Sequence, residues 1–172
     1  MGYTSYISNL PRASALYDAL PQGSISIIHG HGSPGTVYLN VAGEAEQLLT
    51  IYDGSDETYR NICNYSSAAL SNNKLIMFFT CKSAALRNLN SLVDECFNKG
   101  AKCVIGFNRN VARAENWGKL FMEYSHNRVT IQEAINQANA TFEDIYGVYD
   151  TSPADVGNMV ILGNASQKLR VN

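Results

Sequence analysis

"KLIMFFT", residues 74–80, is the most apolar run in the sequence, and the fold can be worked out from it. Seven residues are few for a buried helix, and both faces of a strand this apolar must be covered by other elements. The run therefore predicts a strand at the centre of a sheet. Three further runs fit as strands beside it: "SISII" at 24–28, "AKCVIGF" at 101–107 and "GNMVILGN" at 157–164.

Apolar residues at helical spacing predict helices around these strands, over residues 13–20, 89–97, 117–124 and 130–142. Pro11 fits the first turn of the first helix, Gly100 can end the second, and Thr130 with Glu133 forms a capping box for the last. This alternation is typical of an α/β fold with a mainly parallel central sheet, helices on both faces and right-handed crossovers.

The segments between the first strand and residue 74 are less regular. Residues 36–41 and 47–52 flank a polar turn and predict a small β-hairpin, with a short helix over the second half as the alternative. Residues 55–73 are polar and rich in Ser and Asn. There, Ser55 with Asp56 and Glu57 predicts the start of a helix that carries Tyr59, Ile62 and Cys63.

Composition narrows the class of protein. A chain of 172 residues with 45% hydrophobic residues is expected to form one domain over 1–172 with its own core. The net charge of −2 and the lack of a basic stripe argue against nucleic acid as a partner. Without a signal-peptide core or an apolar run of membrane-spanning length, we expect no membrane association and a cytoplasmic location. The four cysteines show neither CxxC nor zinc-ligand spacing, so we expect free thiols at Cys63, Cys81, Cys96 and Cys103.

Two predicted strands end in residues that can do chemistry. "SISII" is followed by His29-Gly30-His31-Gly32, and "KLIMFFT" by Cys81. Catalytic groups of such sheets gather at the carboxyl edge. An imidazole there can take the proton of a thiol and later protonate a leaving amine, which is the minimum machinery for acyl transfer. Glycines let the backbone turn sharply, so that a main-chain N–H can face a developing oxyanion.

These residues resemble a family. "IIHGHGSPG" (27–35) and "LIMFFTCKSA" (75–84) resemble the two active-site motifs of the caspase-like cysteine peptidases, which include caspases, metacaspases, gingipains, legumain and separase. The spacing of about fifty residues from His to Cys also matches that of caspases. The segments 100–111, 129–138 and 159–171 are similar to later parts of bacterial CHAT-domain and gingipain-like members, so the resemblance covers nearly the whole chain.

The resemblance implies a three-layer caspase-like sandwich and a cysteine endopeptidase that forms a thioacyl-enzyme intermediate on peptide or protein substrates. By position, Cys81 is the nucleophile, His31 the general acid/base, and the N–H groups of Gly32 and Cys81 the oxyanion hole. His29 and Gly30 have supporting roles, with His29 packing against or orienting its neighbour. No cofactor or metal is implied. Some relatives need a partner, self-cleavage or calcium, and the sequence leaves these open, together with an activating second chain.

The sequence also departs from the family pattern. Members that cleave after Arg or Lys often carry an acidic residue two positions before the Cys, where this chain has Phe79. A basic P1 preference is therefore not supported, and Phe79 is the substrate contact expected at that position. Arg109 and Arg113 follow "VIGF" near the usual specificity pocket and can receive an acidic P1 side chain, while Lys82 is expected to face solvent. Only about twenty residues precede the strand that ends at the histidines, so the one or two strands usual before it are missing, or the chain is a piece of a longer protein.

The same residues allow interpretations other than a cysteine peptidase. His29 and His31 can form half of a metal site with Asp53 or Asp56, although a hydrolytic metal needs more ligands. A serine hydrolase is disfavoured because no G-x-S-x-G elbow occurs. The main alternative is an inactive caspase-like module that acts as a protein-interaction or regulatory scaffold. For the remaining residues we expect core positions at Cys96, Cys103 and Trp117, and by preference at Cys63, and a surface or helix C-cap position at His126.

Overall fold

The computed structural model describes residues 12–39, 47–51, 59–86, 90–126 and 128–169. Its main sheet has the strand order β1-β6-β7-β8. These strands span Ile25–His29 (β1), Leu75–Phe79 (β6), Cys103–Phe107 (β7) and Met159–Gly163 (β8). β6 pairs in parallel with β1 and β7, whereas β8 runs antiparallel to β7. The predicted mainly parallel sheet is therefore confirmed, and its most apolar strand lies inside it.

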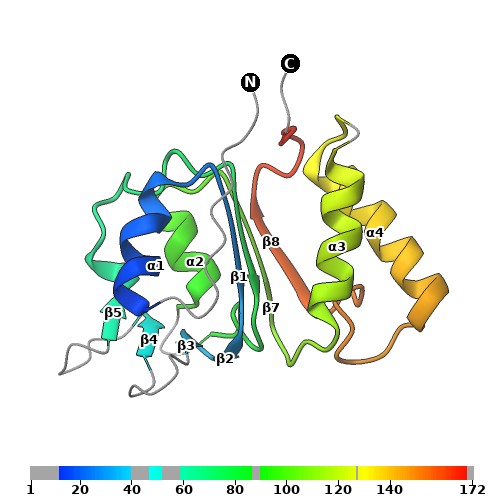
Figure 1. Ribbon diagram of the computed structural model, residues 1–172, viewed down its shortest axis with the longest axis horizontal. Coiled ribbons are helices and arrows are strands. Elements are labelled where there is room, and N and C mark those ends of the chain that lie inside the picture. Colours follow the sequence, from blue (N-terminus) through cyan, green and yellow to red (C-terminus); the bar gives the residue numbers. More distant parts are fainter. Residues whose placement is uncertain (1–11, 40–46, 52–58, 87–89, 127, 170–172) are drawn as a thin grey trace.

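Helices cover both faces of this sheet, as Figure 1 shows. α1 and α2 lie on one face, and α3 and α4 on the other. The helices span Ala13–Ala19 (α1, continued by the 3-10 turn Leu20–Gln22), Leu92–Asn98 (α2), Ala114–Ser125 (α3) and Ile131–Tyr146 (α4). The three-layer α/β sandwich expected from the sequence is thus the observed architecture. None of the described helices is long and apolar enough to cross a membrane.

The sheet separates two apolar cores because consecutive side chains of a strand point to opposite faces. All five residues of β6 are buried. Ile76 and Phe78 belong to the core beneath α1 and α2, whereas Leu75, Met77 and Phe79 belong to the core beneath α3 and α4. A strand covered on both faces in this way needs no polar alternation, which is why its sequence is a continuous apolar run.

The predicted helix ends are largely confirmed. Thr130 and Glu133 form both hydrogen bonds of the capping box at the start of α4. Gly100, directly after α2, has a φ of +102°, a conformation that costs glycine little. Pro11 and Leu89 lie outside the described residues.

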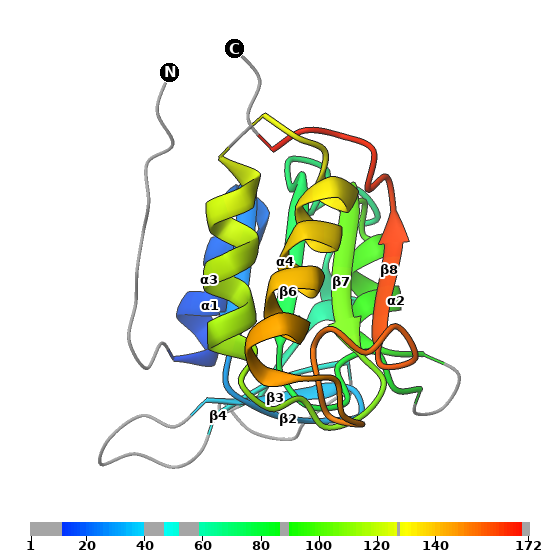
Figure 2. The same cartoon turned by 90° about the vertical axis from the view of Figure 1, so that its right-hand side faces the viewer.

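A second, smaller sheet has the strand order β2-β3-β4-β5. Its strands span His31–Ser33 (β2), Thr36–Leu39 (β3), Gln47–Thr50 (β4) and Tyr59–Asn61 (β5). The predicted hairpin is confirmed by the antiparallel pairing of β3 with β4. β2 adds to it antiparallel and β5 parallel. Figures 1 and 2 show that this sheet lies at the end of the molecule where β1 runs into β2, the carboxyl edge of the parallel strands.

The helix predicted to start at residues 55–57 and to carry Tyr59, Ile62 and Cys63 is wrong in the part that the structure describes. β5 is followed by the 3-10 turn Ile62–Asn64, which Asn61 caps by accepting a hydrogen bond from the Cys63 N–H. The predicted start of that helix at residues 55–57 lies outside the described residues. Residues 55–57 have the pattern of a helix start, but the segment after β5 is held by hydrogen bonds from a side chain at the C-terminal end of α2.

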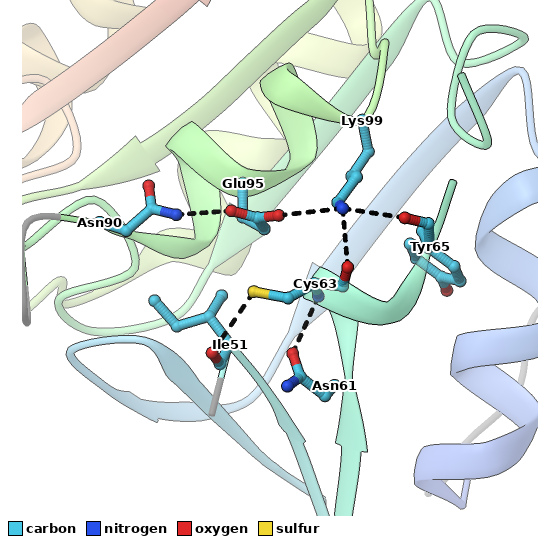
Figure 3. Close-up of polar contacts among 7 residues, drawn as sticks. All are labelled: Ile51, Asn61, Cys63, Tyr65, Asn90, Glu95 and Lys99. Carbon is cyan, nitrogen blue, oxygen red and sulfur yellow. Dashed lines mark hydrogen bonds and ion pairs between the residues drawn. The ribbon is translucent and has the colours of Figure 1, made fainter. Parts of the chain in front are cut away.

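That side chain is Lys99, shown in Figure 3. Its Nζ donates to the carbonyl oxygens of Cys63 and Tyr65 at 2.7 and 2.8 Å, and lies 3.4 Å from Oε1 of Glu95. Asn90 donates to the other carboxylate oxygen of Glu95. The Lys99 and Glu95 side chains are only 16% and 10% exposed. A nearly buried ion pair therefore joins α2 to the chain that follows the small sheet.

Candidate active site

The two strand ends singled out in the sequence lie next to each other. β1 and β6 are parallel neighbours with His29 in register with Phe79, and the Gly30 N–H donates to the Phe79 carbonyl at 3.4 Å. The chains that continue past these residues therefore leave the sheet side by side, one into the histidine segment and the other into Cys81.

The histidine segment approaches the cysteine turn closely at Gly32. A Cβ atom placed on Gly32 would lie 2.6 Å from the carbonyl oxygen of Cys81 and 2.9 Å from Cβ of Thr80. Real side chains do not come this close, so only glycine fits here without a shift of the backbone. By contrast, the nearest atom to a Cβ on Gly30 would be the Tyr38 carbonyl oxygen at 3.4 Å. Of these two glycines, Gly32 is the one that the contact with Cys81 requires.

Cys81 begins a tight turn that is held by main-chain and hydroxyl hydrogen bonds. Ser83, fully buried, donates through Oγ to the Thr80 carbonyl and accepts from the N–H of Phe107, the last residue of β7. The next residue after the cysteine, Lys82, has a φ of +58° and its side chain is exposed. The positive φ shows how sharply the chain turns at the end of β6.

Cys81 is partly exposed, and its sulfur is hydrogen-bonded to the backbone of Val111. The Val111 N–H donates to Sγ at 3.4 Å, and Sγ lies 3.9 Å from the Val111 carbonyl oxygen, to which the thiol can donate. Among the described residues, no hydrogen bond joins this sulfur to His31. The main-chain donor of Val111 was not expected from the sequence.

Both histidines of the pair are exposed on the end of β1 and the start of β2. His31 pairs through its backbone with Tyr38 of β3. Nε2 of His29 lies 3.8 Å from Oε2 of Glu115, in the first turn of α3, and both side chains are more than half exposed. The expectation that His29 packs is wrong, because its side chain projects on the α3 side of an edge strand and reaches solvent beside Glu115.

The three residues named as substrate contacts have different surroundings. Phe79 is only 4% exposed and packs against the rings of Phe107 and Trp117, so it belongs to the core and not to a binding surface. The Arg113 guanidinium lies over the Tyr146 ring, 4.8 Å from its centroid. Arg109 is half exposed, with Nη1 3.6 Å from Oδ2 of Asp155.

The remaining cysteines differ from Cys81. Cys96 and Cys103 are fully buried, as expected, and burial raises the pKa of both thiols, for Cys103 to about 11. Cys63 is only partly buried and its Sγ donates to the Ile51 carbonyl. Raised pKa values keep a thiol protonated and unreactive at neutral pH. The other two cysteines, Cys63 and Cys81, have exposed surface.

Residues expected at the surface or in the core are placed as follows. Trp117 is fully buried, and His126 is the exposed C-cap of α3.

For the metal alternative, the described part of the chain holds no group of three or more His, Cys, Asp or Glu side chains placed to bind an ion. Asp53 and Asp56, named as further ligands, lie outside the described residues.

Sequence reasoning missed the polar residues that surround the Cys81 turn. Ser83, Glu115 and Asn158 were not singled out, and Asn158 is fully buried with hydrogen bonds to the loop that carries Val111. Asn158 lies in the run "GNMVILGN", which was predicted as a strand, so nothing in the sequence marks it as part of a site. Ser83 lies in the segment 75–84 that carries the family resemblance, but no role was assigned to it.

Comparison with known proteins gives a likeness at the level of the fold alone. No model of a protein family matches the sequence, and no curated protein matches it significantly. A solved structure described as "Structure of Protease" superposes with a TM-score of 0.59 at 14% sequence identity. The match covers 93% of this chain and 38% of that one, so this chain spans less than half the length of its neighbour. At this identity the likeness establishes a shared fold: a protein described as a protease contains the same α/β arrangement.

Proposed function

We propose that the protein is a caspase-like cysteine endopeptidase in which Cys81 is the nucleophile and His31 the general acid/base. The observation that carries this proposal is the close approach of Gly32 to the Thr80 side chain and to the Cys81 carbonyl. It brings the histidine segment against the cysteine turn at the carboxyl edge of a parallel sheet, where active sites of such folds occur. The shared fold with a protein described as a protease supports the same reaction class.

The proposed reaction follows from these two groups. His31 takes the Cys81 proton, and the thiolate attacks the peptide carbonyl carbon to give a tetrahedral oxyanion. The N–H groups of Gly32 and Cys81 donate to that oxyanion. As the intermediate collapses, the C–N bond breaks and His31 returns its proton to the leaving amine. His31 then deprotonates a water molecule, which hydrolyses the thioester and releases the new carboxylate and the thiol.

Two neighbouring residues have supporting roles in this proposal. Arg109 is the better of the two arginines for an acidic P1 side chain, because Arg113 is already engaged by Tyr146. Asp155 holds Arg109 and must release it, or share it, when such a substrate binds. His29, beside Glu115, keeps a supporting position and makes no bond in the reaction.

A second candidate function is an inactive module of the same fold that acts as an interaction scaffold. One observation favours it: the hydrogen bonds of the Cys81 sulfur go to Val111 and none to His31 among the described residues. Catalytic hydrogen bonds are often long in unliganded enzymes and tighten when substrate binds, so the peptidase remains the better proposal.

Active-site labelling tests the peptidase proposal. A panel of peptidyl acyloxymethyl ketones with varied P1 residues should modify Cys81 faster than Cys63, and Cys81→Ala should lose both labelling and peptide hydrolysis. His31→Ala should lower hydrolysis by about 10²- to 10⁴-fold, as expected for a lost general base. Because Cys96 and Cys103 are buried, they should stay unlabelled in the folded protein.

Two matched controls are available. Cys63→Ala removes the other partly exposed thiol and should leave hydrolysis intact, and His29→Ala removes the neighbouring imidazole and should change it by no more than a few-fold. If every probe labels Cys63 as fast as Cys81, or if His31→Ala and His29→Ala behave alike, the peptidase proposal fails and the scaffold replaces it.

A further inference from the structure

The loop that carries Val111, residues 108–113, is held by hydrogen bonds on two sides. It connects β7 to α3 at the carboxyl edge of the sheet, and it runs beside the chain that connects α4 to β8, as Figures 1 and 2 both show. The Ala112 N–H donates to the Thr151 carbonyl at 2.9 Å, which ties the two connections together. We call residues 108–113 the Val111 loop.

On one side, a single residue, Asn158, binds three consecutive residues of the Val111 loop. Its backbone carbonyl accepts from the Asn108 N–H at 2.8 Å. Its side-chain Oδ1 accepts from the Arg109 N–H at 2.8 Å, and its Nδ2 donates to the Asn110 carbonyl at 3.1 Å. Nδ2 also lies 3.5 Å from the Ser152 carbonyl. Asn158 is fully buried, so water does not compete for these hydrogen bonds.

On the other side, the same loop holds the nucleophile turn. The Arg109 carbonyl accepts from the Lys82 N–H at 2.9 Å, and the Val111 N–H donates to Sγ of Cys81. The peptide unit between Asn110 and Val111 takes part in the contacts on both sides of the loop. Its carbonyl, which belongs to Asn110, accepts a hydrogen bond from Asn158, and its N–H, which belongs to Val111, donates to the Cys81 sulfur. A hydrogen bond to the carbonyl of a peptide unit polarises its N–H and makes it a stronger donor.

We propose that Asn158 is a positioning residue for Cys81, which holds the Asn110–Val111 peptide unit so that its N–H faces the sulfur. An N–H donor favours the ionised sulfur over the thiol, because hydrogen bonds to charged groups are the stronger ones. Asn158 touches neither substrate nor sulfur and acts only through this peptide unit. The inference rests on the proposed function of Cys81 as a nucleophile.

The test is the rate of Cys81 alkylation by iodoacetamide, followed by peptide mass spectrometry at neutral and at strongly alkaline pH. Asn158→Ala should slow alkylation about tenfold at neutral pH, which is the size expected from a weakened hydrogen bond to a charged group. The deficit should vanish at alkaline pH, where every exposed thiol is ionised. A variant that merely blocks access to the sulfur would slow alkylation equally at both pH values.

Asn73 provides the matched control. It is also a fully buried asparagine, with Nδ2 donating to the Leu20 carbonyl at 2.8 Å and Oδ1 accepting from Ser26 at 2.9 Å. It precedes β6 and so lies at the opposite edge of the sheet from Cys81. Asn73→Ala should therefore lose comparable stability and leave the neutral-pH alkylation of Cys81 unchanged. Equal rates for the two variants at neutral pH would overturn the proposal.

A second measurement does not require Asn158→Ala to fold. In hydrogen exchange of the wild type followed by NMR, the Val111 amide should be protected, and Cys81→Ala should remove that protection while the Arg109 amide, held by Asn158, keeps its own. A Val111 amide that exchanges as fast in the wild type as in Cys81→Ala would overturn the inference. Neither measurement depends on peptide cleavage. If the protein cleaves no peptide but Asn158→Ala slows Cys81 alkylation and the Val111 amide is protected, the peptidase proposal fails and Asn158 remains a positioning residue.

Discussion

Replacing Gly32 by alanine tests the contact on which the site depends. Non-bonded carbon atoms pack best about 3.5–4.0 Å apart. The new methyl group would lie 2.9 Å from Cβ of Thr80 and 2.6 Å from the Cys81 carbonyl oxygen. Relieving the Thr80 contact alone requires a shift of about 0.6 Å, and the second contact puts that shift into the peptide unit of the nucleophile.

Both stability and reactivity should respond. Overpacking of this kind costs about 1–3 kcal/mol, and a displacement approaching 1 Å in an active site can cost about 10²-fold in rate. We therefore expect Gly32→Ala to lower the midpoint of urea unfolding by an amount in that range. We also expect it to lower the rate of Cys81 labelling by peptidyl ketone probes far more than the rate of Cys63 labelling.

Gly30→Ala is the matched control, two residues away in the same segment. Its methyl group would meet only the Tyr38 carbonyl oxygen at 3.4 Å and Val37 Cγ1 at 4.0 Å, which are ordinary contacts. It should change stability by no more than about 0.5 kcal/mol and leave labelling within a few-fold of the wild type. Equal behaviour of the two alanine variants, in unfolding and in labelling, would refute the reasoning.

Three further predictions concern the stability of the fold. Lys99→Met should lower the free energy of unfolding in urea by about 3–5 kcal/mol, because it leaves the Glu95 carboxylate and two carbonyls without their cation. The double variant with Glu95→Gln should recover part of that loss. A loss below about 1 kcal/mol for Lys99→Met would contradict a buried ion pair. Thr130→Ala should cost about 1 kcal/mol by removing the N-cap of α4, as measured in the same way. The hydrogen bonds from Thr130 lower the pKa of Glu133, so the stability that this carboxylate contributes is present above its usual pKa and disappears as the pH falls through the lowered value. Unfolding curves of the wild type and Glu133→Gln should therefore differ at neutral pH and converge in acid, and a difference that persists at about pH 2 would contradict this assignment.

The central layer of the fold could be predicted from the sequence because its strands carry their own signal. β6 and β7 are covered on both faces, so each is a continuous apolar run, and Thr130 with Glu133 marks the start of α4 by local chemistry alone. The small sheet was harder. β2 and β5 have three residues each, with glycine and polar side chains, and they form only because β3 and β4 offer edges to pair with.

Some residues of the candidate site could likewise be predicted from the sequence, and others could not. Cys81 and the histidine pair were found because they end strands that the sequence marks clearly, and parallel strands bring their ends together. The hydrogen bonds of Asn158 could not be found in this way, because Asn158 reaches the Val111 loop across 49 positions of sequence, a distance over which no local pattern carries information. The burial of Phe79 conflicts with its assignment as a substrate contact, but it follows from the apolar run itself, since both faces of that strand are covered.

The donor that faces the Cys81 sulfur belongs to the main chain, and this has an evolutionary consequence. Any amino acid except proline supplies an N–H at position 111, so the hydrogen bond to the sulfur does not depend on which side chain stands there. The partly buried Val111 side chain packs against the core beneath α3 and α4, so natural variants should exchange it for other apolar residues while excluding proline. A sequence profile would then record an ordinary apolar position and miss the main-chain contact with the nucleophile.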